Sequence, residues 1–251
     1  MKQLEAEVTL GIDLASQAKK TGACMVRWQN PVVVETPMIG LTDPALIDLI
    51  SAADKVGIDV PFGWPVEFVG SLATFAAGGA WEIPHTDPRL ALRATDRFVR
   101  QEIGRRPLSV STDKIGITAM RAARLLGMVD PTLDRLGGDR VVEVYPAASL
   151  TVWGFDASRY KGRKGLAVRR QLLEAFREAT EGWVVLSAEC YSCCLSDDNA
   201  FDALISALTA RAASRGLCHP VPGELLEVAR SEGWIALPKP GSLDSLIDES
   251  P

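Results

Sequence analysis

The stretch Val8-Thr9-Leu10-Gly11-Ile12-Asp13-Leu14-Ala15 organises the interpretation of the whole chain. Every second residue from Val8 to Leu14 is apolar, which is the period-2 pattern of a β-strand. Because neither face of this strand is strongly polar, we expect it inside a sheet rather than at the edge. Asp13 then lies at the end of an interior strand, where a carboxylate is costly to bury unless it is paired or binds a cation.

A second copy of this pattern occurs in Val56-Gly57-Ile58-Asp59-Val60, which is again an apolar strand ending in Gly-Ile-Asp. For Asp13 alone, the simpler interpretation is a cap on the following turn, through Ser16 or Gln17. Two aspartates at the ends of two strands instead indicate one shared site.

Length and composition bound the class of protein. A chain of 251 residues with 47% apolar and 24% charged residues is typical of a globular protein, which we interpret as a single domain over residues 1–251. Five cysteines, an odd number, do not favour a disulfide framework, so we expect a cytoplasmic protein with no signal peptide and no membrane span. The net charge of −5 argues against a general nucleic-acid coat protein but not against a local phosphate-binding patch.

The first part of the chain predicts three strands, a helix and a fourth strand. Strands at Gly22–Trp28 and Val32–Glu35 follow the first strand across short links, which favours an antiparallel meander. A helix beginning at Asp43-Pro44 leads into the strand Lys55–Asp59, and such a helical crossover favours parallel pairing. If its partner is the first strand, Asp13 and Asp59 meet at one edge of the sheet.

The rest of the chain predicts a helical insertion followed by a return to the sheet. Residues 61–138 form the insertion, with helical patterns at 66–77, 89–103 and 117–128. The later elements are expected as a strand at 141–146, helices near 165–179 and 198–215, an edge strand at 233–238 and a loose tail at 239–251.

Two further acidic residues are site candidates. Glu143 lies on a predicted strand, and Asp202 lies too deep in a predicted helix to act as its cap. Asp198, one turn earlier, can point to the same side as Asp202 or serve as the cap. Clustered carboxylates repel one another unless cations neutralise them, and Mg²⁺ or Mn²⁺ are the usual choices. Two such ions can hydrolyse a phosphodiester.

Six motifs in this order resemble one family, described as predicted nucleases with an RNase H-like fold (domain of unknown function 429). They span nearly the whole chain: Gly-Ile-Asp-Leu-Ala at 11–15, Ile-Asp-Val-Pro-Phe-Gly at 58–63, Arg-Ala-Thr-Asp-Arg at 93–97, Glu-Val-Tyr-Pro-Ala at 143–147, Asp-Ala-Leu at 202–204 and Glu-Gly-Trp-Ile at 232–235.

The resemblance implies an α/β, RNase H-like fold with a mixed five-stranded sheet and flanking helices. It also implies a metal-dependent nuclease, a hydrolase in which Asp13, Asp59 and Asp202 are the catalytic, metal-binding acids. Either Asp198 or Asn199 is then the second metal ligand on this helix, and Glu143 or Asp198 completes the ligand shell or orients water. Arg93 and Asp96 belong to one of the motifs, which implies that they orient groups near the metal ions.

Two basic stretches are candidate phosphate contacts in this acidic chain. Arg89, Arg93 and Arg97 are spaced to share one helix face, near Arg100, and a second stretch runs from Lys161 to Arg170. The alternative is a solvated face with internal ion pairs such as Asp96 with Arg93. Trp64 follows Asp59 by five residues, so it is a candidate substrate contact at the mouth of the site.

Other interpretations stay open. One is an ATP-binding phosphotransferase of the actin and sugar-kinase type, and another is a non-catalytic regulatory module. Cys190, Cys193 and Cys194 with Cys218 and His219 form a rival zinc set, weighed against buried, inert thiols. Nucleic acid is the candidate partner, DNA, RNA and a small phosphodiester stay open as substrates, and a homodimer stays open beside a monomer.

Overall fold

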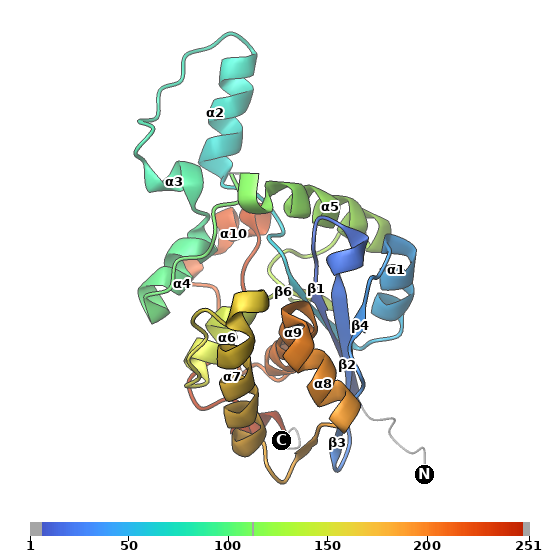
Figure 1. Cartoon of the computed structure of the whole chain (residues 1–251). Helices are drawn as coiled ribbons and strands as arrows, with labels where there is room; N and C mark the ends of the chain where they lie inside the picture. Colours follow the sequence, from blue (N-terminus) through green and yellow to red (C-terminus); the bar gives the residue numbers. More distant parts are fainter. Residues whose placement is uncertain (1–6, 112, 248–251) are drawn as a thin grey trace.

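A mixed β-sheet forms the centre of the computed structural model, which describes residues 7–111 and 113–247 (Figure 1). The strand order is β6-β5-β1-β2-β3-β7, and β4 pairs with β2. The strands are β1 (Glu7–Asp13), β2 (Gly22–Trp28), β3 (Val32–Val34), β4 (Met38–Ile39), β5 (Lys55–Asp59), β6 (Val141–Glu143) and β7 (Val184–Val185).

The first three strands form the predicted antiparallel meander, and β5 and β6 then add in parallel on the other side of β1. The sequence predicts five strands, whereas the described residues form seven. The two additional strands, β4 and β7, have two residues each and lie away from β1 and β5. They are too short to show a periodic apolar pattern, so the pattern of apolar residues does not predict them.

Helices surround the sheet and fill the long connection between β5 and β6 (Figure 1). They are α1 (Asp43–Ser51), α2 (Val66–Ala76), α3 (Pro88–Ala91), α4 (Ala94–Ile103), α5 (Asp113–Val129), α6 (Pro146–Val152), α7 (Leu166–Ala179), α8 (Ala188–Ser196), α9 (Asp198–Ser214) and α10 (Leu226–Glu232). The helix predicted at 89–103 is broken, because the backbone of Leu92 and Arg93 is extended between α3 and α4.

Helix α9 packs directly on the middle of the sheet because two glycines make room for it. A Cβ atom at Gly11 of β1 would lie 1.9 Å from the carbonyl oxygen of Ala203. A Cβ atom at Gly57 of β5 would lie 2.5 Å from the carbonyl oxygen of Ser206. Both distances are far below van der Waals contact, so only glycine allows this approach of helix to strand. The glycines of the two Gly-Ile-Asp motifs therefore position α9 and, with it, Asp202.

The end of the described chain corrects two predictions. The strand predicted at 233–238 forms only isolated bridges, one of them between Ile235 and Glu143. The tail is not loose over residues 239–247, because Leu243 and Leu246 are 6% and 0% exposed and belong to the core that includes Phe201. Burial of these apolar side chains holds the segment against the domain. Residues 248–251 lie outside the described part of the chain.

Candidate functional site

The two strand-end aspartates lie side by side. Strands β1 and β5 are parallel, and Asp13 and Asp59 are direct partners in their register. Both residues are partly buried. Among the residues that the structure describes, none donates a hydrogen bond to either carboxylate. The sheet therefore presents two unpaired carboxylates at the carboxyl ends of adjacent parallel strands, where α/β sheets commonly bind ligands.

Asp202 of α9 is 0% exposed and is held by two consecutive residues of one loop. The hydroxyl of Tyr160 donates a hydrogen bond of 2.5 Å to Asp202 Oδ1. The ammonium group of Lys161 lies 2.6 Å from Oδ2 and forms an ion pair with it. This Oδ2 accepts no hydrogen bond from the described residues. One loop therefore supplies both a neutral and a cationic partner to the buried carboxylate.

The electrostatics of the site reflect the crowding of like charges. Burial raises the pKa of the Asp13 carboxyl well above its ordinary value, and repulsion from Asp202 and Asp59 raises it further. Burial also raises the pKa of Asp59 to about 7, against a lowering by Lys161. Burial lowers the pKa of Lys161, but the combined attraction to Asp202 and to the neighbouring acidic groups outweighs burial, so its pKa is well above the ordinary value. These acids thus share one electrostatic environment that favours a bound cation.

A cavity of about 420 Å³ opens beside these groups. Asp13, Asp59 and Lys161 line one part of it, and Arg105 and Arg159 add two guanidinium groups. Its remaining walls include apolar side chains, among them Pro107, Leu108, Ile115, Tyr145 and Ala157. A volume of this size is typical of a pocket for a small ligand. The cavity combines carboxylates that suit a cation with cationic side chains that suit an anion.

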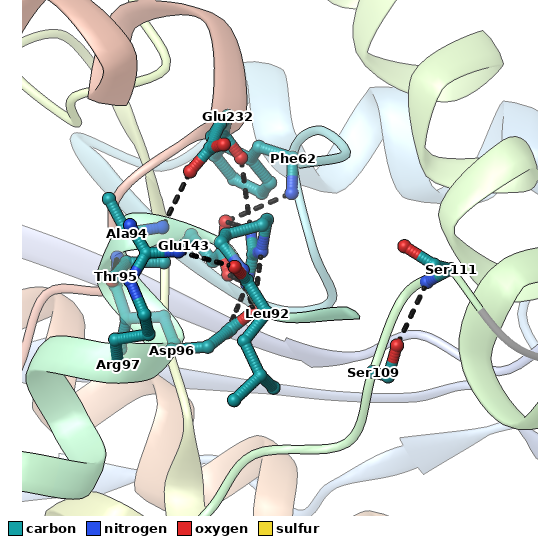
Figure 2. A network of polar contacts seen from close by, with 12 residues as sticks. Phe62, Leu92, Ala94, Thr95, Asp96, Arg97, Ser109, Ser111, Glu143 and Glu232 are labelled. Carbon is teal, nitrogen blue, oxygen red and sulfur yellow. Dashed lines mark hydrogen bonds and ion pairs between the residues drawn. The ribbon is translucent and has the colours of Figure 1, made fainter. Parts of the chain in front are cut away.

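Glu143, expected as a catalytic acid, lies in a buried ion-pair network. Its carboxylate oxygens accept hydrogen bonds of 2.8 and 2.6 Å from Arg93 and one of 2.9 Å from the backbone N–H of Phe62. Arg93 also pairs with Asp96 at 2.9 Å, and all three charged side chains are at most 2% exposed. Figure 2 shows Glu143 between Phe62 and Asp96. Arg93, Asp96 and Glu143 line the cavity, but their charged groups form ion pairs with one another.

Glu232 completes this network and was not predicted from the sequence. Its carboxylate accepts a hydrogen bond of 2.5 Å from the backbone N–H of Ala94 (Figure 2) and one of 2.8 Å from the backbone N–H of Val66. Its backbone carbonyl accepts one from Arg93. Glu232 thereby caps the first turn of α4 and joins it to α2 and α10. The network fixes the position of the wall of the cavity, which is a structural role.

The other predicted substrate contacts lie outside the cavity wall. Trp64 is partly buried but is not among the lining residues, and Arg97 donates a hydrogen bond of 2.7 Å to the carbonyl of Leu92. Arg89, expected on one face with Arg93, is exposed and pairs with Glu67 and Asp87. The break between α3 and α4 separates these arginines, so the shared basic face predicted from their spacing does not form.

Asp198 and the cysteines were also predicted as metal ligands. Asp198 forms an ion pair with the buried Arg169 at 3.9 Å. Its repulsion raises the pKa of Asp13 less than the repulsion from Asp202 or Asp59 does. The five cysteines are free thiols. Over residues 7–111 and 113–247, no three or more His, Cys, Asp or Glu side chains are grouped so that they could hold a metal ion. The cysteines and His219 therefore form no such group within the described residues, and Asp13 and Asp59 are the carboxylates that lie side by side.

Three residues of the site, Arg105, Arg159 and Tyr160, were not predicted from the sequence, and neither was the contact of Lys161 with Asp202. Arg159 is the one non-glycine residue with positive φ, 55°, in the described chain, and such strain is commonly found at functional sites. The sequence places Lys161 in a basic stretch but cannot show that it faces Asp202. A tyrosine next to a lysine in a glycine-rich loop is the signal that could have drawn attention to this pair.

The chain belongs to the family described as "Protein of unknown function (DUF429)", whose family model matches residues 11–227. Comparison with curated proteins and with solved structures found no match. Across the described residues, no helix is long and apolar enough to cross a membrane.

Proposed function

We propose that this protein is a metal-dependent phosphodiesterase of the nuclease class, built on an RNase H-like fold. The observation that carries the proposal is the parallel register of β1 and β5, which makes Asp13 and Asp59 neighbours at the edge of a cavity lined by Arg105, Arg159 and Lys161. Unpaired carboxylates suit a hard divalent cation, and the basic side chains suit a phosphate group.

The topology supports the fold part of the proposal. An antiparallel meander is followed by a helix and two parallel strands, giving the order β3-β2-β1-β5-β6 through the central part of the sheet. This is the arrangement that the RNase H-like resemblance implies, with the first strand central and paired to the strand after the first helix. Fold alone does not define a substrate, so the site must carry the functional argument.

The donor set fits Mg²⁺ or Mn²⁺ bound to Asp13 and Asp59, with Asp202 beside them. One observation supports this fit: among the residues that the structure describes, none donates a hydrogen bond to the carboxylate of Asp13 or Asp59, and the two residues are direct partners in the register of β1 and β5. When bound, such an ion activates water and stabilises charge on phosphoryl oxygens. Glu143 does not belong to this set, because Arg93 and Phe62 already occupy its oxygens.

The chain's own residues would act mainly by orientation and by charge. Arg159 is exposed, lines the cavity and has no hydrogen bond or ion pair to the residues that the structure describes, so its guanidinium group can bind a phosphate. Arg105 is partly committed, since it donates to the carbonyl of Ala157 at 2.6 Å and to Thr151 Oγ1 at 3.1 Å. The apolar walls limit the access of water to the reacting group.

Incubation of the protein with Mn²⁺ or Mg²⁺ tests the proposal, using single-stranded, duplex and branched DNA and RNA together with a small chromogenic phosphodiester. We expect cleavage that a chelator stops and that Asp13→Asn and Asp59→Asn each reduce at least about 100-fold. Asp48→Asn is the matched control, because Asp48 is an exposed aspartate on α1, outside this cavity. Cleavage that survives Asp13→Asn and Asp59→Asn would overturn the assignment.

A further inference from the structure

The loop residues Tyr160 and Lys161 occupy both oxygens of Asp202, the carboxylate that α9 brings to the site. The phenol hydroxyl donates to Oδ1 at 2.5 Å, and the ammonium group pairs with Oδ2 at 2.6 Å. A carboxylate with both oxygens engaged has less capacity to bind a metal ion directly. The position beside Asp202 is therefore already filled by a cation from the protein itself.

The loop that carries Lys161 is fixed in place. Tyr160 is 1% exposed, and its ring packs edge-on against Phe201 with a centroid separation of 6.0 Å. Its backbone carbonyl accepts a hydrogen bond of 2.6 Å from Arg169, which is itself 2% exposed. A Cβ atom at Gly165 would lie 2.3 Å from the carbonyl carbon of Tyr160, so the turn packs tightly beneath it. The side chain of Lys161 therefore starts from a rigid, buried anchor.

Lys161 also remains accessible to a ligand. Its side chain is 50% exposed and lines the same cavity as Asp13 and Asp59. When all three are ionised, the carboxylates of Asp13, Asp59 and Asp202 carry three negative charges and the ammonium group of Lys161 carries one positive charge, so these four groups have a net charge of −2. One divalent cation balances that charge, whereas two would leave an excess of positive charge in a partly buried site.

We propose that Lys161 is a built-in second cation, so that the site holds one divalent metal ion, at Asp13 and Asp59, instead of two. This proposal rests on the proposed function and specifies which group supplies the second positive charge at the site. The ammonium group of Lys161, held by Asp202, would contact the same phosphate as the metal ion.

The test is the stoichiometry of Mn²⁺ binding to the intact protein, measured by titration calorimetry and by the paramagnetic resonance signal of free Mn²⁺. We expect one Mn²⁺ per chain for the wild type, two for Lys161→Met and one for Lys161→Arg, which keeps the charge. Lys164→Met is the matched control, because Lys164 is exposed in the same loop and does not line the cavity, and it should bind one.

The outcomes separate this inference from the proposed function. Two Mn²⁺ ions bound to the wild type would overturn the inference and leave a metal-dependent phosphodiesterase standing. Unchanged stoichiometry in a folded Lys161→Met variant would also overturn it. No binding by either protein would overturn the metal-dependent function and the inference together. If Lys161→Met fails to fold, the stoichiometry of the wild type and of Lys161→Arg decides the question.

Discussion

Gly11 and Gly57 are direct partners in the register of β1 and β5, and the backbone of α9 lies against both of them. This relationship links the fold to the candidate site. Because α9 can approach the two strands so closely, Asp202 reaches the strand ends where Asp13 and Asp59 lie. The two residue types of the Gly-Ile-Asp repeat therefore have separate roles. The glycine allows α9 to pack closely on the strand, and the aspartate lies near Asp202 of that helix.

The first prediction concerns these glycines. Gly11→Ala should lower the free energy of unfolding by about 1–3 kcal/mol, because its methyl group would overlap the carbonyl of Ala203. Urea denaturation measures the change. Gly70→Ala is the matched control, since nothing lies within 4 Å of a Cβ atom there and the residue is inside α2. The control should gain about 0.5–1 kcal/mol. Equal stability of Gly11→Ala and wild type would contradict the close packing described here.

The second prediction concerns pH in the absence of metal. Burial raises the pKa of Asp59 to about 7 in the folded protein, whereas in the unfolded chain it is about 4. Between these values the unfolded chain releases a proton that the folded protein retains, so stability should fall as pH rises. The slope for this carboxyl is at most about 1.4 kcal/mol per pH unit.

Denaturation at several pH values in the presence of a chelator measures this slope. Asp59→Asn should flatten the profile and be more stable than the wild type near pH 7, because it removes the cost of an uncompensated buried carboxylate. Asp48→Asn should leave the profile unchanged, since Asp48 is exposed. If the free energy of unfolding rose between about pH 4 and about pH 7, with the same slope in the wild type and in Asp59→Asn, the pKa of Asp59 would not be raised by folding.

The third prediction separates structural from functional acids. Glu143→Gln should cost about 3–5 kcal/mol, because it removes one partner of the buried Arg93. It should nevertheless keep the thermal stabilisation by Mn²⁺, which Asp13→Asn should lose. Thermal unfolding with and without Mn²⁺ measures both effects. A Glu143→Gln variant of normal stability that no longer responds to Mn²⁺ would place Glu143 among the metal ligands instead.

The fourth prediction concerns Arg159 and rests on the proposed function. Arg159→Ala and Arg159→Gly should each raise KM about 10-fold with little change in kcat, because one charge-assisted contact to the substrate is lost. The two variants should differ in stability. Glycine adopts the observed φ of 55° without strain, so Arg159→Gly should be about 1 kcal/mol more stable than Arg159→Ala. Steady-state kinetics and urea denaturation provide the two readouts, and an unchanged KM would remove Arg159 from the substrate site.

The sequence by itself determined which strands carry Asp13 and Asp59 and that these two strands are neighbours in the sheet. The alternation of apolar residues in β1 and β5, with a helix between them, is a local pattern that limits the pairing to a few choices. From this pattern the parallel pairing of the two strands and the meeting of Asp13 with Asp59 could be predicted, and the structure confirms both.

Only the tertiary structure decided which of the acids are unpaired. Glu143 and Arg93 are 50 residues apart in the chain, and Tyr160 and Asp202 are 42 apart. No local period or spacing relates such residues, because their contact depends on how the break before α4 and the loop before α7 cross the edge of the sheet. A buried charge takes whichever partner the packing brings within reach. The fold therefore pairs Glu143 with Arg93 and places Lys161 beside Asp202.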